Sequence, residues 1–203
     1  MSHTDASHWQ IHVLLWHKQG VPVTTYPGTK FRRDRPPMDA ERLERLALHY
    51  VGRYATTRGK LVTYLAHKIR ERGWAGESQP DLTALAERLA MLGYIDDRAF
   101  ATGRARSLTA QGYGKARVRQ VLHAAGIDED DAAPAYAIAE DTSWTAALRF
   151  AQKRRIGPYA ADASDRRGRE KAIAAMIRAG HGFQISRAIA LALPGDIPDV
   201  VGR

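Results

Sequence analysis

The sequence predicts an all-α protein in which three tandem three-helix repeats follow one another along the chain. Helix-favouring residues such as alanine, leucine and arginine are abundant, while runs typical of β-strands are almost absent. Apolar residues recur at the i, i+3, i+4, i+7 spacing of one helix face, and glycine or proline ends most of these runs. Gly73, Gly126 and Gly180 each close a middle helix, about 50 residues apart, which indicates a tandem array. We therefore expect an elongated, curved array of helices.

Residues 1–37 are predicted to be a flexible, poorly ordered tail. Several prolines interrupt any helix there, and residues 31–35 add a basic patch. The tail carries four histidines, His3, His8, His12 and His17. A metal site is conceivable because two of them would share a helix face, but the chain has no cysteine to complete one. Scattered histidines in a flexible tail are the preferred interpretation.

The first repeat, residues 38–93, is predicted to contain helices over 39–52, 57–73 and 81–93. An aspartate opens the first and the third of these helices, and a glycine ends all three. Aspartate is favoured at the N-cap because its carboxylate accepts a hydrogen bond from a free backbone N–H in the first turn.

The second repeat, residues 94–140, and the third repeat, residues 141–203, follow the same plan. Their predicted helices cover 96–111, 115–125, 128–139, 141–156, 165–180 and 183–193. Asp96 or Asp97 is expected to cap the first of these helices, where an acid also interacts favourably with the helix dipole. The acidic run 128–131 is expected to act mainly within the first turn of its own helix.

No motif in the sequence indicates an enzyme, a cofactor or a metal site. There is no phosphate-binding G-x-x-x-x-G-K-[ST] loop, no H-E-x-x-H and no G-x-S-x-G. The absence of cysteine excludes disulfides, thiolate metal sites and a cysteine nucleophile. Asp96 and Asp97 are the only tempting carboxylate pair, and a capping role accounts for them. We therefore expect a non-enzymatic protein with no cofactor.

The charge of the chain indicates a polyanionic or acidic partner instead. The formal net charge is +9, and no acidic residue lies between Arg98 and Ile127. Tyr113 and Tyr159 lie beside basic clusters and could stack on bases or simply pack. A solvated charged face remains the alternative for any single cation. The candidate nucleic-acid or partner-binding residues are Arg104, Arg106, Lys115, Arg117, Arg119, Lys153, Arg154, Arg155, Arg166, Arg167, Arg169 and Lys171.

The middle of the chain resembles a known family. The segment R-L-A-M-L-G-Y-I-D-D-R-A-F-A covers residues 88–101, and the turn Gly112-Tyr113-Gly114 and a helix closed by Gly126 follow it. This pattern is similar to the central repeat of the RecX family, whose G-Y-[IL]-[DN]-D-x-x-[FY]-A core is fairly specific. The resemblance covers about 39–193 and is weaker in the first and last repeats.

The resemblance implies a regulator of the RecA recombinase. Members of the family bind in the groove of the RecA–single-stranded-DNA filament and inhibit its ATPase and strand exchange, with some affinity for DNA, weaker for double strands. The alternative is a general basic helical DNA-binding protein without a recombinase partner. We also expect a cytoplasmic monomer, because no secretory signal or run long enough to span a membrane is evident.

Overall fold

In the computed structural model, residues 36–199 are described, and they form nine α-helices with no β-strand among them. An isolated bridge between Met38 and Trp74 is the one β-type pairing in this part of the chain. The predicted all-α fold of three-helix units is therefore confirmed. Most of the predicted tail, with its four histidines, lies outside the described residues.

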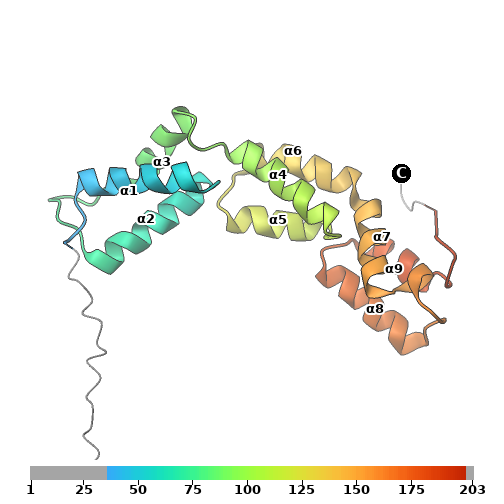
Figure 1. The fold of residues 1–203 in the computed structure, drawn as a ribbon. Helices are drawn as coiled ribbons and strands as arrows, with labels where there is room; N and C mark the ends of the chain where they lie inside the picture. Colours follow the sequence, from blue (N-terminus) through green and yellow to red (C-terminus); the bar gives the residue numbers. More distant parts are fainter. Residues whose placement is uncertain (1–35, 200–203) are drawn as a thin grey trace, which may run out of the picture. The chain divides into compact units, whose positions relative to one another are not determined.

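The first set of helices packs around its own apolar core. Its members are α1 (Ala40–Arg53), α2 (Arg58–Arg72) and α3 (Leu82–Met91). Figure 1 draws these helices in blue to green. Asp39, Thr57 and Asp81 are the N-caps, and each side chain accepts a hydrogen bond from a backbone N–H three residues along. These helices begin where the sequence predicts, because a cap is made within one turn of chain.

The second set has an alanine-rich core that lets two of its helices pack closely. Its members are α4 (Asp97–Ala110), α5 (Lys115–Ala124) and α6 (Glu129–Asp141). The helices α4 and α6 lie along each other in Figure 1. Buried alanines on α4 and α6, among them Ala105 and Ala135, occupy the contact between these helices. Leu122 and Val118 of α5 complete this core and are fully buried.

The third set follows α6 almost without a break. Its members are α7 (Ser143–Arg154), a short 3-10 turn η1 (Gly157–Tyr159), α8 (Arg166–Arg178) and α9 (Phe183–Leu191). Met176 of α8 and Ile189 of α9 form the buried centre of this set. Each set thus has a separate core cluster, while the exact domain boundaries near 93 and 140 stay a prediction.

The middle helices of the first two sets meet end to end. At this first junction the N-terminus of α2 faces the C-terminus of α5, and Thr57 Oγ1 donates a hydrogen bond to the Ala125 carbonyl. A Cβ added at Gly59 would lie 2.8 Å from Gly126 Cα. Because neither residue has a side chain, the two backbones can come this close.

A second junction of the same kind joins α5 to α8. Gly114 N donates to Ala179 O over 3.0 Å, and Ala116 N donates to Gly180 O over 3.1 Å. Unsatisfied N–H groups at one helix start therefore bond to unsatisfied carbonyls at another helix end. The two helix dipoles also follow each other in the favourable direction.

The three glycines that mark the repeat in the sequence do not all have the same role. Gly126 and Gly180 lie at the two junctions, with φ of +70° and +95°. Gly73 also has a positive φ, but its carbonyl accepts from Met38 N over 2.9 Å, so the segment before α1 covers this helix end. The regular spacing of the three glycines therefore marks the helix ends that contact an earlier segment of the chain.

Candidate functional site

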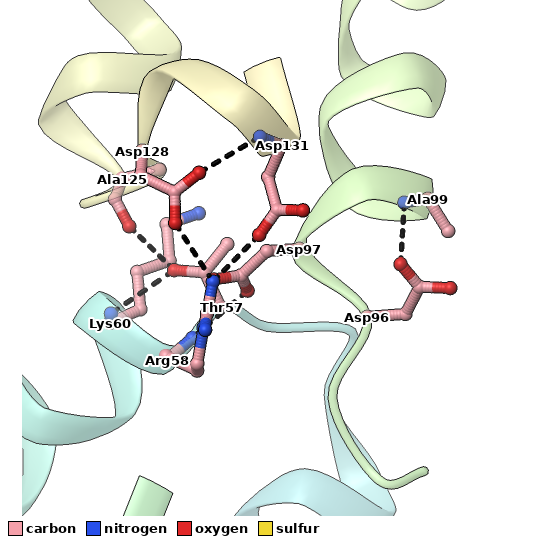
Figure 2. Close-up of polar contacts among 9 residues, drawn as sticks. All are labelled: Thr57, Arg58, Lys60, Asp96, Asp97, Ala99, Ala125, Asp128 and Asp131. Atoms are coloured by element: carbon pink, nitrogen blue, oxygen red, sulfur yellow. Dashed lines mark hydrogen bonds and ion pairs between the residues drawn. The ribbon is translucent and has the colours of Figure 1, made fainter. Parts of the chain in front are cut away.

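An ionic cluster centred on Arg58 connects the first set of helices to the second (Figure 2). Arg58 Nε lies 2.8 Å from Asp97 Oδ2, and its backbone N–H donates to Asp97 Oδ1 over 3.0 Å. Its terminal nitrogen contacts Asp128 Oδ2 at 3.1 Å and Asp131 Oδ2 at 2.6 Å. One guanidinium from α2 thus holds three carboxylates at the starts of α4 and α6.

The two aspartates of the G-Y-I-D-D segment have different roles. Asp96 is the N-cap of α4, and its Oδ1 accepts from Ala99 N over 2.8 Å, as Figure 2 shows. Asp97 does not cap the helix; its side chain is only 2% exposed and is bound by Arg58. The sequence-based expectation that capping explains both residues is therefore wrong for Asp97.

The charges of this cluster favour a structural role. The hydrogen bond to Asp97 raises the pKa of Arg58, although burial opposes the shift. Burial and the neighbouring Asp128 raise the pKa of Asp131, and the attraction of Arg58 only partly offsets them. Residues 36–199 contain no group of acidic or histidine side chains suited to a metal ion.

Sequence reasoning missed Arg58, although one local signal was available. Arg58 is the first residue of α2, whose first turn carries no acid. A cation at a helix N-terminus is unfavourable to the helix dipole. Such a residue is more easily explained by carboxylates from elsewhere in the fold, here 39 to 73 residues further along the chain.

The second junction carries a buried histidine instead of an ionic cluster. His181 is 5% exposed, and its Nε2 lies 3.0 Å from the Gly112 carbonyl. Its ring lies beside Phe150, with 5.6 Å between the ring centroids. Burial lowers the pKa of His181, and the hydrogen bond to Gly112 opposes that shift. The ring is therefore neutral in the folded protein near pH 7.

Acidification is expected to weaken the second junction. Below the ordinary histidine pKa of about 6.5 the unfolded chain binds a proton that folded His181 resists, so stability is lost as pH falls. We expect the free energy of unfolding, measured in urea, to fall between about pH 7.5 and pH 5.5. His181→Gln keeps a hydrogen-bond donor for Gly112 and should lose part of this pH dependence. An unchanged pH profile in this variant would contradict the assignment.

Most candidate cations of the second set already have partners. Lys115 Nζ lies 2.7 Å from Glu140, and Arg117 bonds to Gln120 and lies over the Tyr113 ring. Arg119 lies over the Tyr136 ring, with 4.9 Å to its centroid. Arg104 and Arg106 are exposed on α4 and make no ion pair within residues 36–199. All five are on the surface, and none of them lines the hollow described below.

The candidate cations of the third set divide in the same way. Arg166 pairs with Glu170, and Arg169 and Lys153 donate to the backbone carbonyls of Ser164 and Gln111. Arg154 lies over the Phe150 ring. The side chains of Arg155, Arg167 and Lys171 make no hydrogen bond, ion pair or ring contact in the described part of the chain.

Three of these cations meet at one pocket. Arg154, Arg155 and Lys171 line a hollow of about 550 Å³ together with Arg178, which sequence analysis did not single out. We refer to this hollow, lined by Arg154, Arg155, Lys171 and Arg178, as the basic pocket. Its other walls include Tyr113, Phe150 and Ser164, and no carboxylate lines it. The arrangement suits a bound anion, because four cations and no carboxylate line the hollow.

Comparisons with known proteins identify the family. A family model described as "RecX, second three-helix domain" matches residues 96–135. The regulatory protein RecX of Myxococcus xanthus (strain DK1622) is 32% identical over 155 residues, which cover 72% of this chain and 83% of that protein. The chain belongs to the RecX family. The resemblance noted in the sequence at 88–127 is therefore confirmed.

Solved RecX structures share the fold of this family member. A crystal structure of regulatory protein RecX matches with a TM-score of 0.52 and 20% identity, covering 73% of this chain and 70% of that chain. RecX from Lactobacillus salivarius matches with the same TM-score and identity, covering 73% of this chain and 92% of that chain. None of the described helices of this RecX chain is long and apolar enough to cross a membrane.

Proposed function

We propose that this RecX family member binds the filament that RecA forms on single-stranded DNA and lowers its ATP hydrolysis and strand exchange. Membership of a family of regulatory proteins carries the proposal. The exposed cations without counter-ions support it, because a polyanionic filament would supply the missing negative charge. The protein would act as a cytoplasmic monomer, without catalysis.

The proposal treats residues 38–93, 94–140 and 141–203 as three binding units held in register. Close backbone contacts at both junctions support this view, because Gly–Gly approaches and the Arg58 cluster resist separation of neighbouring sets. A rigid series of units can contact several protomers of a filament without ordering itself first, which lowers the entropic cost of binding.

ATP hydrolysis by the cognate recombinase on single-stranded DNA tests the proposal. Titration of the wild-type chain is expected to lower the rate, and Arg117→Glu/Arg119→Glu should require roughly tenfold more protein for the same effect. Arg149→Glu/Arg187→Glu reverses two exposed charges outside the candidate set and serves as the matched control. No effect of the wild-type chain at stoichiometric levels would refute the proposal.

A general DNA-binding protein is the alternative function. The net charge of +9 and the acid-free segment 98–127 favour it. This alternative requires DNA affinity that falls steeply with salt, while the ATPase rate of the recombinase stays unchanged. The same titration therefore distinguishes the two functions.

A further inference from the structure

The basic pocket has features that the surface cations elsewhere do not share. It lies where the C-terminal end of α7 and the turn after it meet α8, with Tyr113 from the second set at its edge. Its volume of about 550 Å³ falls in the range typical of small-ligand sites, roughly 300–1,000 Å³. Cationic and aromatic side chains line it together, so it offers both charge and flat apolar surface.

We propose that the basic pocket holds one nucleotide unit of single-stranded DNA, with the four cations on the phosphate and Tyr113 against the base. The inference rests on the proposed function and deepens it, because it names the part of the chain that contacts the DNA strand. Alternating phosphates and bases present the two kinds of group that this lining suits.

The charge balance of the pocket supports an anionic occupant. Arg154, Arg155, Lys171 and Arg178 make no ion pair within residues 36–199. Arg88 and Arg166 have carboxylate partners in the same part of the chain, whereas the exposed Arg104 and Arg106 do not. The pocket differs from these in bringing four such cations together. Like charges that converge without counter-ions repel one another, and a bound phosphate removes that repulsion.

The backbone at Arg155 gives an independent indication. Arg155 has φ 53° and ψ 50°, and it is the only non-glycine residue with positive φ in the described part of the chain. It ends α7 at a position where glycine is the ordinary residue, because a Cβ is unfavourable there. Arg155 therefore brings a cation to the pocket although its backbone has a conformation that glycine would adopt more easily. Such outliers are found preferentially at binding sites.

The aromatic walls favour a nucleotide over an acidic peptide. Tyr113 and Phe150 both line the pocket, and Arg154 lies 5.9 Å from the Phe150 ring centroid. Aspartate and glutamate side chains would use the cations but not these rings. A base can stack on an aromatic face whatever its identity, so this contact needs no particular DNA sequence.

Arg155→Gly is the most informative variant. Glycine adopts positive φ without strain, so the variant should unfold at the same or a higher urea concentration than the wild-type chain. Fluorescence anisotropy of a labelled oligothymidylate then measures binding as a function of salt. We expect Arg155→Gly/Lys171→Ala to bind roughly tenfold more weakly and to lower the log–log salt slope by at most about 0.7, because both cations contact the same phosphate.

Two further variants separate charge from stacking. Tyr113→Ala should weaken binding several-fold without changing the salt slope, whereas Tyr113→Phe should bind like the wild-type chain. Arg45→Ala/Arg88→Ala removes the same net charge from cations already paired with Glu41 and Glu44, so its salt slope should be nearly unchanged. An equal loss in this control would overturn the assignment of the pocket.

Competition and the recombinase assay decide the remaining outcomes. Polyglutamate that displaces the oligonucleotide from the wild-type chain, but not from Arg155→Gly/Lys171→Ala, would assign the pocket to an acidic polypeptide and overturn the proposal. If the pocket variants bind DNA normally while the wild-type chain inhibits the recombinase, the pocket assignment is wrong but the proposed function is still supported. If they lose DNA binding while the wild-type chain has no effect on the recombinase, the proposed function fails and the pocket stands.

Discussion

Replacing Gly180 by alanine is expected to lower the free energy of unfolding by about 3 kcal/mol. The residue has φ +95°, which L-residues rarely adopt. The new Cβ would also meet the backbone N of Arg117 and would lie 3.0 Å from the Gly114 carbonyl oxygen. Because these neighbours are backbone atoms, relief requires α5 and α8 to move apart. Urea denaturation measures the loss.

Gly103→Ala provides a matched control of opposite sign. Gly103 lies inside α4, and a Cβ there would meet nothing within 4 Å. Alanine favours the helix by roughly 0.5–1 kcal/mol over glycine, so this variant should be slightly more stable than the wild-type chain. If both variants changed stability equally, the close approach at Gly180 would not be the cause.

Replacing Arg58 by methionine is expected to cost about 2–3 kcal/mol of unfolding free energy. Asp97 would keep its charge with a side chain 2% exposed, and it would lose its main counter-ion. Leaving one member of a fully buried pair unpaired costs roughly 3–5 kcal/mol, and we expect less here because Arg58 is 34% exposed and water screens the cluster. Urea unfolding at low and high salt tests this, with the larger loss at low salt.

A double-mutant cycle isolates the pair. Asp97→Asn keeps an oxygen that can accept from the Arg58 N–H, so Arg58→Met/Asp97→Asn should lose less stability than the two single changes together. Arg88→Met removes an exposed arginine paired with Glu44 and should change stability by no more than about 0.5 kcal/mol. Strict additivity in the cycle would show that Arg58 and Asp97 are not coupled.

Three of the four cations that line the basic pocket could be anticipated from the sequence. Arg154, Arg155 and Lys171 lie in basic runs of the sequence, and these residues do line one pocket. Nothing in the sequence marks Arg178, because a cation in the last turn of a helix is ordinarily explained by the helix dipole. The sequence could not show which of the remaining candidate cations are paired with an acid and which are free. Ion pairs such as that of Lys115 with Glu140 connect residues on different helices.

By itself the sequence determined the helices, their caps and the three-part plan of this RecX family member. Those features are local: Asp39, Asp81 and Asp165 each accept a hydrogen bond from a residue three positions along the chain. The resemblance to the RecX family also came from a contiguous segment, 88–127.

Only the tertiary structure decided how the sets are joined. Arg58 finds its carboxylates in the second set, and Gly126 and Gly180 lie against helix starts in the preceding sets. Sequence spacing carries no information on such contacts, because they arise only when separate helices pack and their ends meet. The protein therefore encodes its units locally, and the junctions between them by residues distant in the chain.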